Sequence, residues 1–152
     1  MFRISVVTVI IFLSALPAGA GSRMIDGPVA AEVVKVIDGD TVLVEAMPWP
    51  DHKVSTYVRL RGIDAPELRS KCPAFRKAAQ AAKSELANLI GNERLVQLTA
   101  ISGDKYFGRV VADLTLQDGT RPAENLLEAG LVDPYSGRTK SKRLCPSVMK
   151  DR

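Results

Sequence analysis

Two short segments of the chain carry side chains whose types and spacing suit chemistry on a phosphate ester. The first segment is IDGDT at residues 37–41, and the second is RLRGIDAPE at residues 59–67. Asp40 opens a predicted strand and Asp64 ends another, so their carboxylates can approach each other and share one hard cation. Oxygen ligands favour calcium, magnesium or manganese over zinc. With a third acid and an arginine nearby, these are the parts that metal-assisted cleavage of a phosphodiester requires.

The third acid and the arginines have separate chemical roles in this interpretation. Glu67, three residues after the second aspartate, can take a proton from a water molecule. Arg59 and Arg61 share one strand face, and the planar fork of arginine matches a phosphate. Only one of the two needs to act on the substrate, while the other pairs with an acid or lies in solvent. Arg109 begins a later strand and can stabilise charge in the transition state.

Each acid also has a purely structural interpretation. Asp40 and Asp64 can be turn aspartates that bond their own backbone. Asp38 is interpreted as the turn residue, with a position behind the metal ligands as the alternative. Glu67 can be a solvated acid ahead of a helix. The chemical interpretation therefore depends on a fold that brings these residues together.

Aromatic side chains offer weaker indications. Tyr106 can stack on a base or bond a phosphate, or it can be a half-buried ring that closes a turn. Tyr135 has the same two interpretations. Trp49 and His52 lie in a polar loop, and we assign them no role. Because His52 is the only histidine, multi-histidine metal sites are excluded and a zinc enzyme is disfavoured.

The elements that must position these residues follow from hydrophobic periodicity and turn signals. The pattern predicts strands at residues 29–37, 41–46, 56–62, 95–101 and 109–116, and helices at residues 73–90 and 122–129. We interpret residues 47–52 as a turn or loop, because two prolines disfavour a central strand. Five short strands with a helix between the third and fourth predict an α+β, mainly β fold. The expected architecture is a five-stranded Greek-key barrel of the OB-fold type with two or three flanking helices.

The N-terminal residues have the pattern of a secretory signal peptide. Arg3 provides a positive charge, residues 4–16 are an almost continuous apolar run, and cleavage is expected after Ala20. An uncleaved anchor is the alternative, although the run is shorter than the roughly 20 residues that a membrane span needs. We expect a secreted or periplasmic protein with no membrane span after cleavage, and we expect it to be a monomer.

Charge is concentrated at the C-terminus. The whole chain of 152 residues has a net charge of +4 and is 46% hydrophobic and 25% charged, which is ordinary for one globular domain. Residues 138–152 hold six basic side chains against one acid, whereas residues 21–137 are slightly acidic in sum. We therefore expect one domain at residues 21–137 and a basic tail at residues 138–152. The tail suits a polyanion, or it is only a soluble terminus.

The two cysteines, Cys72 and Cys145, suggest one disulfide in an exported protein. Such a bond would tie the tail to the start of the first helix. Two free thiols are the alternative.

Taken together, these motifs resemble the staphylococcal nuclease (thermonuclease) family from about Val33 to Tyr135. The resemblance rests on IDGDT, on RLRGIDAPE, on DKYFGR at residues 104–109, and on the order of strands and helices. It implies a calcium-dependent nuclease, an endonuclease or exonuclease with low sequence preference. Such an enzyme acts on DNA and RNA and leaves 3′-phosphate ends.

The resemblance also implies roles for particular residues. Asp40, Asp64 and the main-chain carbonyl of Ala65 correspond to the calcium ligands. Glu67 corresponds to the general base, and Arg59 and Arg109 to the phosphate-binding pair. Arg61 does not fall on a catalytic position.

The chain departs from the family pattern in three places. Phe107 stands between Tyr106 and Gly108, where the familiar pattern runs Tyr-Gly-Arg, and an extra residue can bulge the turn and re-aim Arg109. The last family helix has no clear counterpart in residues 137–152, and the cysteine pair is not part of the pattern.

Two other function classes compete with an enzyme. The first is an OB-fold module that holds nucleic acid or a protein without cutting it, and the second is a structural envelope protein. Acids in a cleft for a polyanion favour the enzyme, because they are a liability unless a cation neutralises them.

Overall fold

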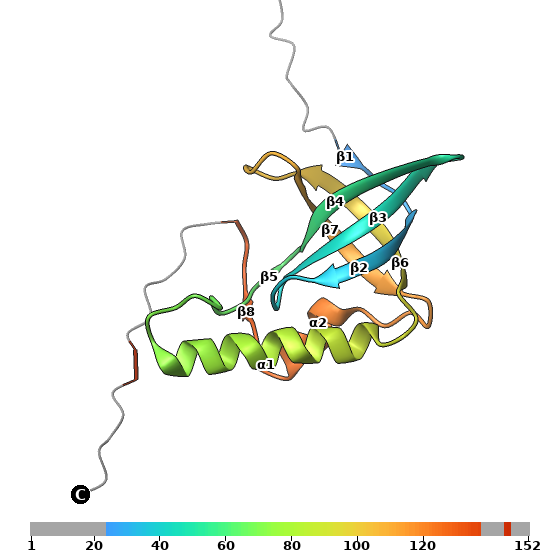
Figure 1. The fold of residues 1–152 in the computed structure, drawn as a ribbon. Helices are drawn as coiled ribbons and strands as arrows, with labels where there is room; N and C mark the ends of the chain where they lie inside the picture. Colours follow the sequence, from blue (N-terminus) through green and yellow to red (C-terminus); the bar gives the residue numbers. More distant parts are fainter. Residues whose placement is uncertain (1–23, 138–144, 147–152) are drawn as a thin grey trace, which may run out of the picture.

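The computed structural model describes residues 24–137 and 145–146, and Figure 1 shows a small barrel with two helices packed below it. The expected signal peptide and most of the basic tail lie outside the described residues. The elements in chain order are β1 (Met24–Ile25), β2 (Val29–Val36), β3 (Thr41–Trp49), β4 (His52–Leu60), β5 (Ile63–Asp64), α1 (Pro73–Ile90), β6 (Leu95–Gly103), β7 (Arg109–Leu116), α2 (Pro122–Glu128) and β8 (Asp133–Pro134).

Five strands close the barrel in the order β2, β3, β4, β7 and β6, and β6 pairs back with β2. All these pairings are antiparallel except that of β4 with β7, which is parallel. β1 adds a short pairing at the edge of β6. The predicted OB-fold barrel, mainly β with flanking helices, is therefore confirmed.

The core fills the barrel with the inward side chains of alternating strand residues. Val42, Val44, Val58 and Leu60 are almost completely buried, as the period of two along β3 and β4 requires. Helix α1 contributes Leu86 to the same core, and α2 contributes Leu126. Each such buried side chain stabilises the fold by roughly 1.5–3 kcal/mol. The two helices thus cover one end of the barrel (Figure 1).

The hairpin of β3 and β4 is longer than the sequence indicates. The turn or loop predicted at residues 47–52 is confirmed only at residues 50–51. The prediction is wrong for the rest, because β3 continues to Trp49 and β4 starts at His52. Pro48 is tolerated because the pairing register shifts between Ala46 and Trp49. At such an irregularity the neighbouring strand does not need the N–H that proline lacks. At its other end β4 stops at Leu60, two residues earlier than predicted.

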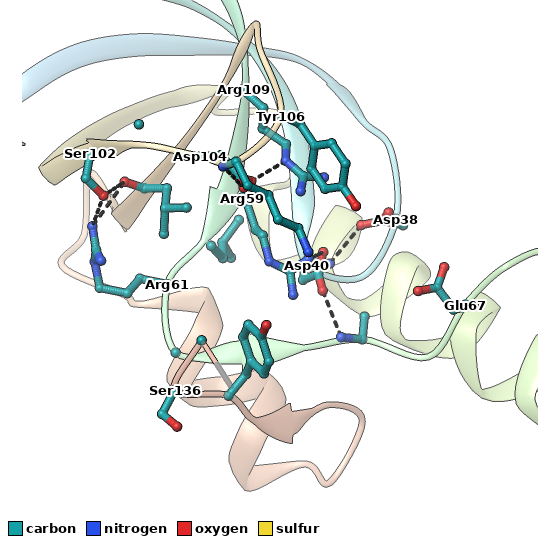
Figure 2. A pocket seen from close by; sticks show the side chains of 18 of the residues that line it. Asp38, Asp40, Arg59, Arg61, Glu67, Ser102, Asp104, Tyr106, Arg109 and Ser136 are labelled. Carbon is teal, nitrogen blue, oxygen red and sulfur yellow. Dashed lines mark hydrogen bonds and ion pairs between the residues drawn. The ribbon is translucent and has the colours of Figure 1, made fainter. Parts of the chain in front are cut away.

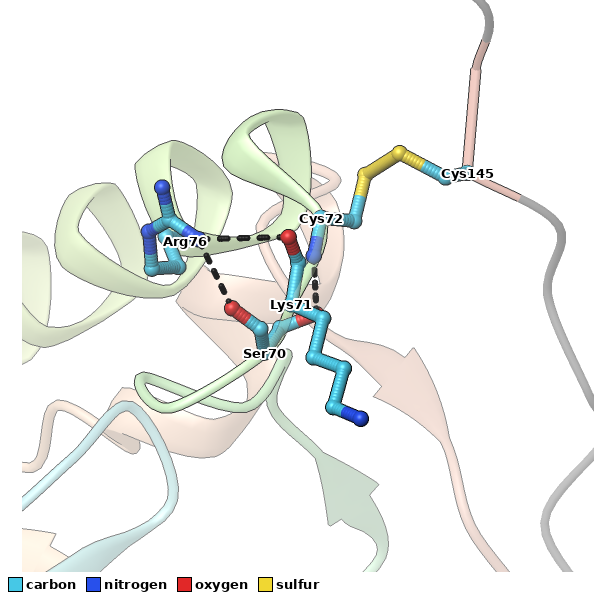
Figure 3. The surroundings of a disulfide bond; sticks show 5 residues. All are labelled: Ser70, Lys71, Cys72, Arg76 and Cys145. Carbon is cyan, nitrogen blue, oxygen red and sulfur yellow. Dashed lines mark hydrogen bonds between the residues drawn. A yellow bond between two sulfur atoms is a disulfide. The ribbon is translucent and has the colours of Figure 1, made fainter.

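Helix α1 begins at a disulfide. Cys72 is the N-cap residue, Pro73 occupies the first turn, and Gly91 ends the helix with a positive φ. The sulfur atoms of Cys72 and Cys145 are bonded across a separation of 73 residues, which confirms the predicted pairing (Figure 3). Beside it, the Arg76 guanidinium donates to two main-chain carbonyls of the loop before the helix. Within residues 24–137 and 145–146, no helix is long and apolar enough to cross a membrane.

Gly39 is where the β2–β3 turn packs directly on helix α1. A Cβ added at Gly39 would lie 2.6 Å from the Cβ of Ala82 and 2.9 Å from the Cβ of Ala65. Only glycine allows this approach, which seats the turn carrying Asp40 between the helix and the segment after β5.

We therefore expect Gly39→Ala to lower the free energy of unfolding by about 1–3 kcal/mol, because the added methyl group overpacks this contact. Urea denaturation measures the loss. Gly103→Ala is the matched control, since no atom lies within 4 Å of its added Cβ. An equal effect of the two substitutions would contradict the proposed contact.

Candidate active site

A cleft of about 600 Å³ opens at the outer side of β4. Its lining includes residues from four parts of the chain: the β2–β3 turn with Asp38 and Asp40, the segment from Arg59 to Glu67, the β6–β7 turn from Ser102 to Arg109, and the segment after β8 from Tyr135 to Gly137. Figure 2 shows these side chains around one space. The two predicted motifs therefore do meet in the fold.

Asp40 is the most enclosed acid of the cleft, with 3% of its surface exposed. One carboxylate oxygen, Oδ1, accepts hydrogen bonds from the Thr41 hydroxyl at 2.8 Å and from Arg59 Nη1 at 2.9 Å. The other, Oδ2, accepts from the main-chain N–H of Ala65 at 2.8 Å. The main-chain oxygen of Asp40 accepts from the N–H of Leu60. Asp40 is thus held in place from both β4 and the segment that follows β5.

Arg59 bridges the two predicted metal-ligand acids. Its Nη1 donates to Asp40, and its Nη2 donates to Asp64 Oδ1 at 2.7 Å and to the carbonyl of Ile63 at 3.2 Å. The β3–β4 register explains the first contact, because it places Thr41 opposite Arg59. Only 15% of the Arg59 side chain is exposed, so breaking this network is expected to cost roughly 3–5 kcal/mol.

The charge of Arg59 is maintained by its partners. Burial by itself would lower the pKa of Arg59, but the negative charge of Asp40 and the contact with Asp64 outweigh it, and the pKa is raised. The guanidinium therefore stays charged at every pH at which the protein is folded.

A small second sheet positions Asp64. The two-residue strands β5 and β8 pair with Ile63 opposite Pro134 and Asp64 opposite Asp133. The N–H of Tyr135 donates to the carbonyl of Gly62, and the guanidinium of Arg59 lies 5.5 Å from the centre of the Tyr135 ring. This pairing brings Tyr135, a weak candidate by sequence, under the central arginine.

Asp38 and Glu67 lie farther out than Asp40. Asp38 accepts the N–H of Asp40 at 3.1 Å, as a turn aspartate does. Burial, and after it the charge of Asp40, raise the pKa of the Asp38 carboxyl. Glu67 lines the cleft, and Figure 2 shows it at the edge, apart from the contact between Arg59 and Asp40.

Arg109 lines the same cleft as Arg59 despite the additional Phe107. The extra residue is accommodated in a turn in which the Arg109 N–H donates to the Tyr106 carbonyl and Gly108 has a φ of +79°. The Arg109 side chain is oriented by an ion pair with Asp104 and lies 4.7 Å from the centre of the Tyr106 ring.

Sequence reasoning gave Asp104 no role, although an acid at the start of a turn that ends in arginine is a recognisable signal. Burial would raise its pKa, but the hydrogen bond and charge of Arg109 outweigh burial, so the pKa of Asp104 is lowered.

Arg61 is turned toward β6 and β7 rather than toward the two acids. Its Nη2 donates to the main-chain carbonyls of Ala100 and Val111 and to the Ser102 hydroxyl, and its Nε lies 3.7 Å from Asp113. These carbonyls flank an irregularity in the β6–β7 pairing. The sequence left two alternatives for the second arginine, pairing with an acid or lying in solvent, and the contact of Arg61 with Asp113 favours the first.

Asp40 and Arg59 line the cleft, and Asp64 adjoins it through its ion pair with Arg59. The oxygen donors of these two acids suit a hard cation. The carboxylates of Asp40 and Asp64 are bonded to one guanidinium, so both come within reach of a single ion. Two carboxylates against one arginine also leave an excess of negative charge. Among the described residues, no three or more His, Cys, Asp or Glu side chains converge as a ready metal-ligand group. A cation here would therefore need main-chain oxygens and water to complete its ligands.

The fold is a closed barrel of the OB type, and acids and arginines line one cleft on it. These two features place the protein among OB-fold proteins with a charged cleft. The model of the family described as staphylococcal nuclease homologue matches residues 57–146, and the chain belongs to the staphylococcal nuclease family. The family is one of nucleases. The matched part includes Arg59, Asp64, Glu67 and Arg109, whereas Asp40 precedes it. Comparison with curated proteins found no match.

We expect the effect of Asp38→Asn on stability to depend on pH. The pKa of Asp38 is raised in the folded state, so its protonated form favours the fold, and that stability is lost as the pH rises through the folded pKa. The neutral variant should therefore gain free energy of unfolding relative to wild type between about pH 3.5 and about pH 7.

Urea denaturation in a chelating buffer at both pH values measures this difference. The prediction would be contradicted if the free energy of unfolding of the variant, relative to wild type, were the same at both pH values or higher at the acidic pH.

Proposed function

We propose that this protein is an exported, calcium-dependent nuclease that hydrolyses phosphodiester bonds in DNA and RNA with low sequence preference. The observation that carries the proposal is the bridge from Arg59 to Asp40 and Asp64, together with a cleft that Asp40, Arg59 and Arg109 all line. A protein that only held nucleic acid would have no use for two carboxylates beside its phosphate-binding arginines. Membership of a nuclease family supports the same conclusion.

In this proposal the arginines hold the scissile phosphate. Arg59 is kept charged by its acidic neighbours, and Arg109 is oriented by Asp104, so both guanidinium groups are charged and present in the cleft before the substrate arrives. Each guanidinium donates two hydrogen bonds to phosphate oxygens and stabilises the extra negative charge of the transition state.

Glu67 acts as the general base in the proposed reaction. It takes a proton from a water molecule, whose oxygen forms a new bond to phosphorus while the bond to the 5′ oxygen breaks. The products are a 3′-phosphate end and a 5′-hydroxyl end, and the 5′ oxygen takes up a proton from solvent.

Calcium would be held by Asp40, Asp64 and the main-chain carbonyl of Ala65. When bound, it supplies positive charge to the phosphate. The N–H of Ala65 donates to Asp40, so the residue whose carbonyl is the candidate ligand is held beside that acid.

Export is supported by two features. The N-terminal sequence has the pattern of a signal peptide, and the Cys72–Cys145 disulfide is compatible with an oxidising compartment such as the periplasm or the exterior of the cell.

The direct test is a cleavage assay on purified residues 21–152 with single-stranded DNA and RNA. We expect cleavage with calcium and none with chelator. Glu67→Gln and Arg59→Lys should each lower kcat/KM by at least about a hundredfold, because they remove the base and the planar fork. Mass spectrometry of the products should find 3′-phosphate ends.

Matched controls are Glu124→Gln and Arg121→Lys, an exposed ion pair at the start of α2. These variants should cut like wild type. A protein that binds DNA but cuts it with no divalent cation is a binding module, and that result would refute the proposal.

A further inference from the structure

Positive charge is concentrated in the loop before helix α1 and in the first half of that helix. Residues 68–83 hold five basic side chains and no acid, whereas the rest of residues 24–137 hold eight basic side chains against 16 acidic ones. Four of the five are exposed, and we call them the α1 basic surface: Arg69, Lys71, Arg76 and Lys77. On a domain that is otherwise acidic, such a surface attracts a polyanion to one place.

The loop that carries part of this surface is held in a fixed shape. The Arg76 guanidinium donates to the carbonyl of Ser70 at 2.9 Å and to that of Lys71 at 3.3 Å (Figure 3). The N–H of Cys72 donates to the Ser70 hydroxyl at 3.2 Å, and Cys72 is bonded to Cys145. The basic side chains of the loop therefore stand on an anchored backbone.

The position of these charges does not serve the stability of the helix. Lys71 precedes the N-cap residue Cys72, and Arg76 follows one turn later, at the end where the helix dipole is positive. Cations at this end destabilise a helix, and the first turn of α1 has no acid to compensate them. An external anion can supply the missing negative charge.

The α1 basic surface begins close to the rim of the cleft. Glu67 lines the cleft, and its carbonyl accepts the N–H of Ser70 at 3.1 Å. Four residues of chain span at most about 14 Å, which limits the distance between the Cα atoms of Glu67 and Lys71. Because an OB fold contacts roughly 4–16 nucleotides, a strand held in the cleft is long enough to reach this surface.

The surface suits a nucleic-acid backbone rather than a lipid membrane. Helices that lie on membranes carry large apolar side chains that enter the bilayer. None of the exposed large apolar side chains of the protein's described residues lies within residues 68–83. Exposed arginine and lysine without such groups fit a row of phosphates.

Resting on the proposed function, we propose that the α1 basic surface is a second phosphate-binding site, which holds the backbone of a nucleic-acid strand beyond the cleft. Its contacts are to phosphates and therefore carry no sequence preference. They raise the affinity for long strands, whereas a substrate confined to the cleft does not reach them.

The test removes three charges from this surface. The variant combines Arg69→Gln, Lys71→Gln and Lys77→Gln, and it keeps Arg76 because that side chain holds the loop. Fluorescence anisotropy in chelator measures its binding to a labelled oligothymidylate of about 30 nucleotides, longer than one OB fold covers, over a range of salt concentrations. We expect binding at least about tenfold weaker in low salt, and a slope of log K against log salt that is shallower by about 2.

A short substrate shows whether the variant is folded and whether its cleft is intact. With calcium, the kcat/KM of the variant for a trinucleotide should equal that of wild type. The matched control combines Lys35→Gln, Lys53→Gln and Arg121→Gln, which change the net charge equally at exposed positions outside the cleft. This control should bind the long strand like wild type.

Equal binding of the long strand by the two triple variants would overturn the inference, while cleavage by wild type would still support the proposed function. Normal strand binding by the first variant, combined with lost sedimentation on phosphatidylglycerol vesicles, would assign the surface to a membrane and also overturn the inference. A wild type that neither binds nor cuts any strand would overturn both.

Discussion

The bridge from Arg59 to Asp40 and Asp64 is the interaction on which the rest of the site depends. It requires the β3–β4 register that sets Thr41 opposite Arg59, and it requires the β5–β8 pairing that fixes Asp64. Gly39 adds the close contact with helix α1 that seats the turn before Asp40. A barrel wall, a small second sheet and a helix thus converge on one guanidinium.

The bridge also gives a physical reason to expect a cation. Arg59 is the partner of two buried or half-buried carboxylates and is also the proposed ligand of the phosphate. When it turns toward a substrate, these acids lose part of their compensating charge in a cleft that must accept a polyanion. A bound cation resolves this conflict. Arg109 has a simpler setting, because a single acid, Asp104, orients it from outside the central bridge.

Much of the fold could be predicted from periodicity and turn signals. Helix α1 is clear because its buried residues recur on one face from a proline start to a glycine stop. The strands β1, β5 and β8 have two residues each and carry no periodic signal. The sequence does not predict the full length of the β3–β4 hairpin, because a proline normally argues against a strand. Pro48 lies where the β3–β4 pairing is irregular, so no hydrogen bond between the strands needs its missing N–H. The alternation of side chains along the strand placed Arg59 and Arg61 on one face. Only the tertiary structure shows that Arg61 donates to a main-chain carbonyl exposed by the irregular β6–β7 pairing. The site acids could be named from motifs, and their catalytic roles stay predictions.

Calorimetric titration with calcium tests the central claim most directly. The account predicts that wild type binds calcium and that Asp40→Asn and Asp64→Asn each lose this binding, because each removes a carboxylate from the bridged pair. Asp51→Asn, in the distant β3–β4 turn, is the control and should bind like wild type. Calcium binding that survives in folded Asp40→Asn and Asp64→Asn would contradict the claim that the Arg59-bridged carboxylates form the metal site.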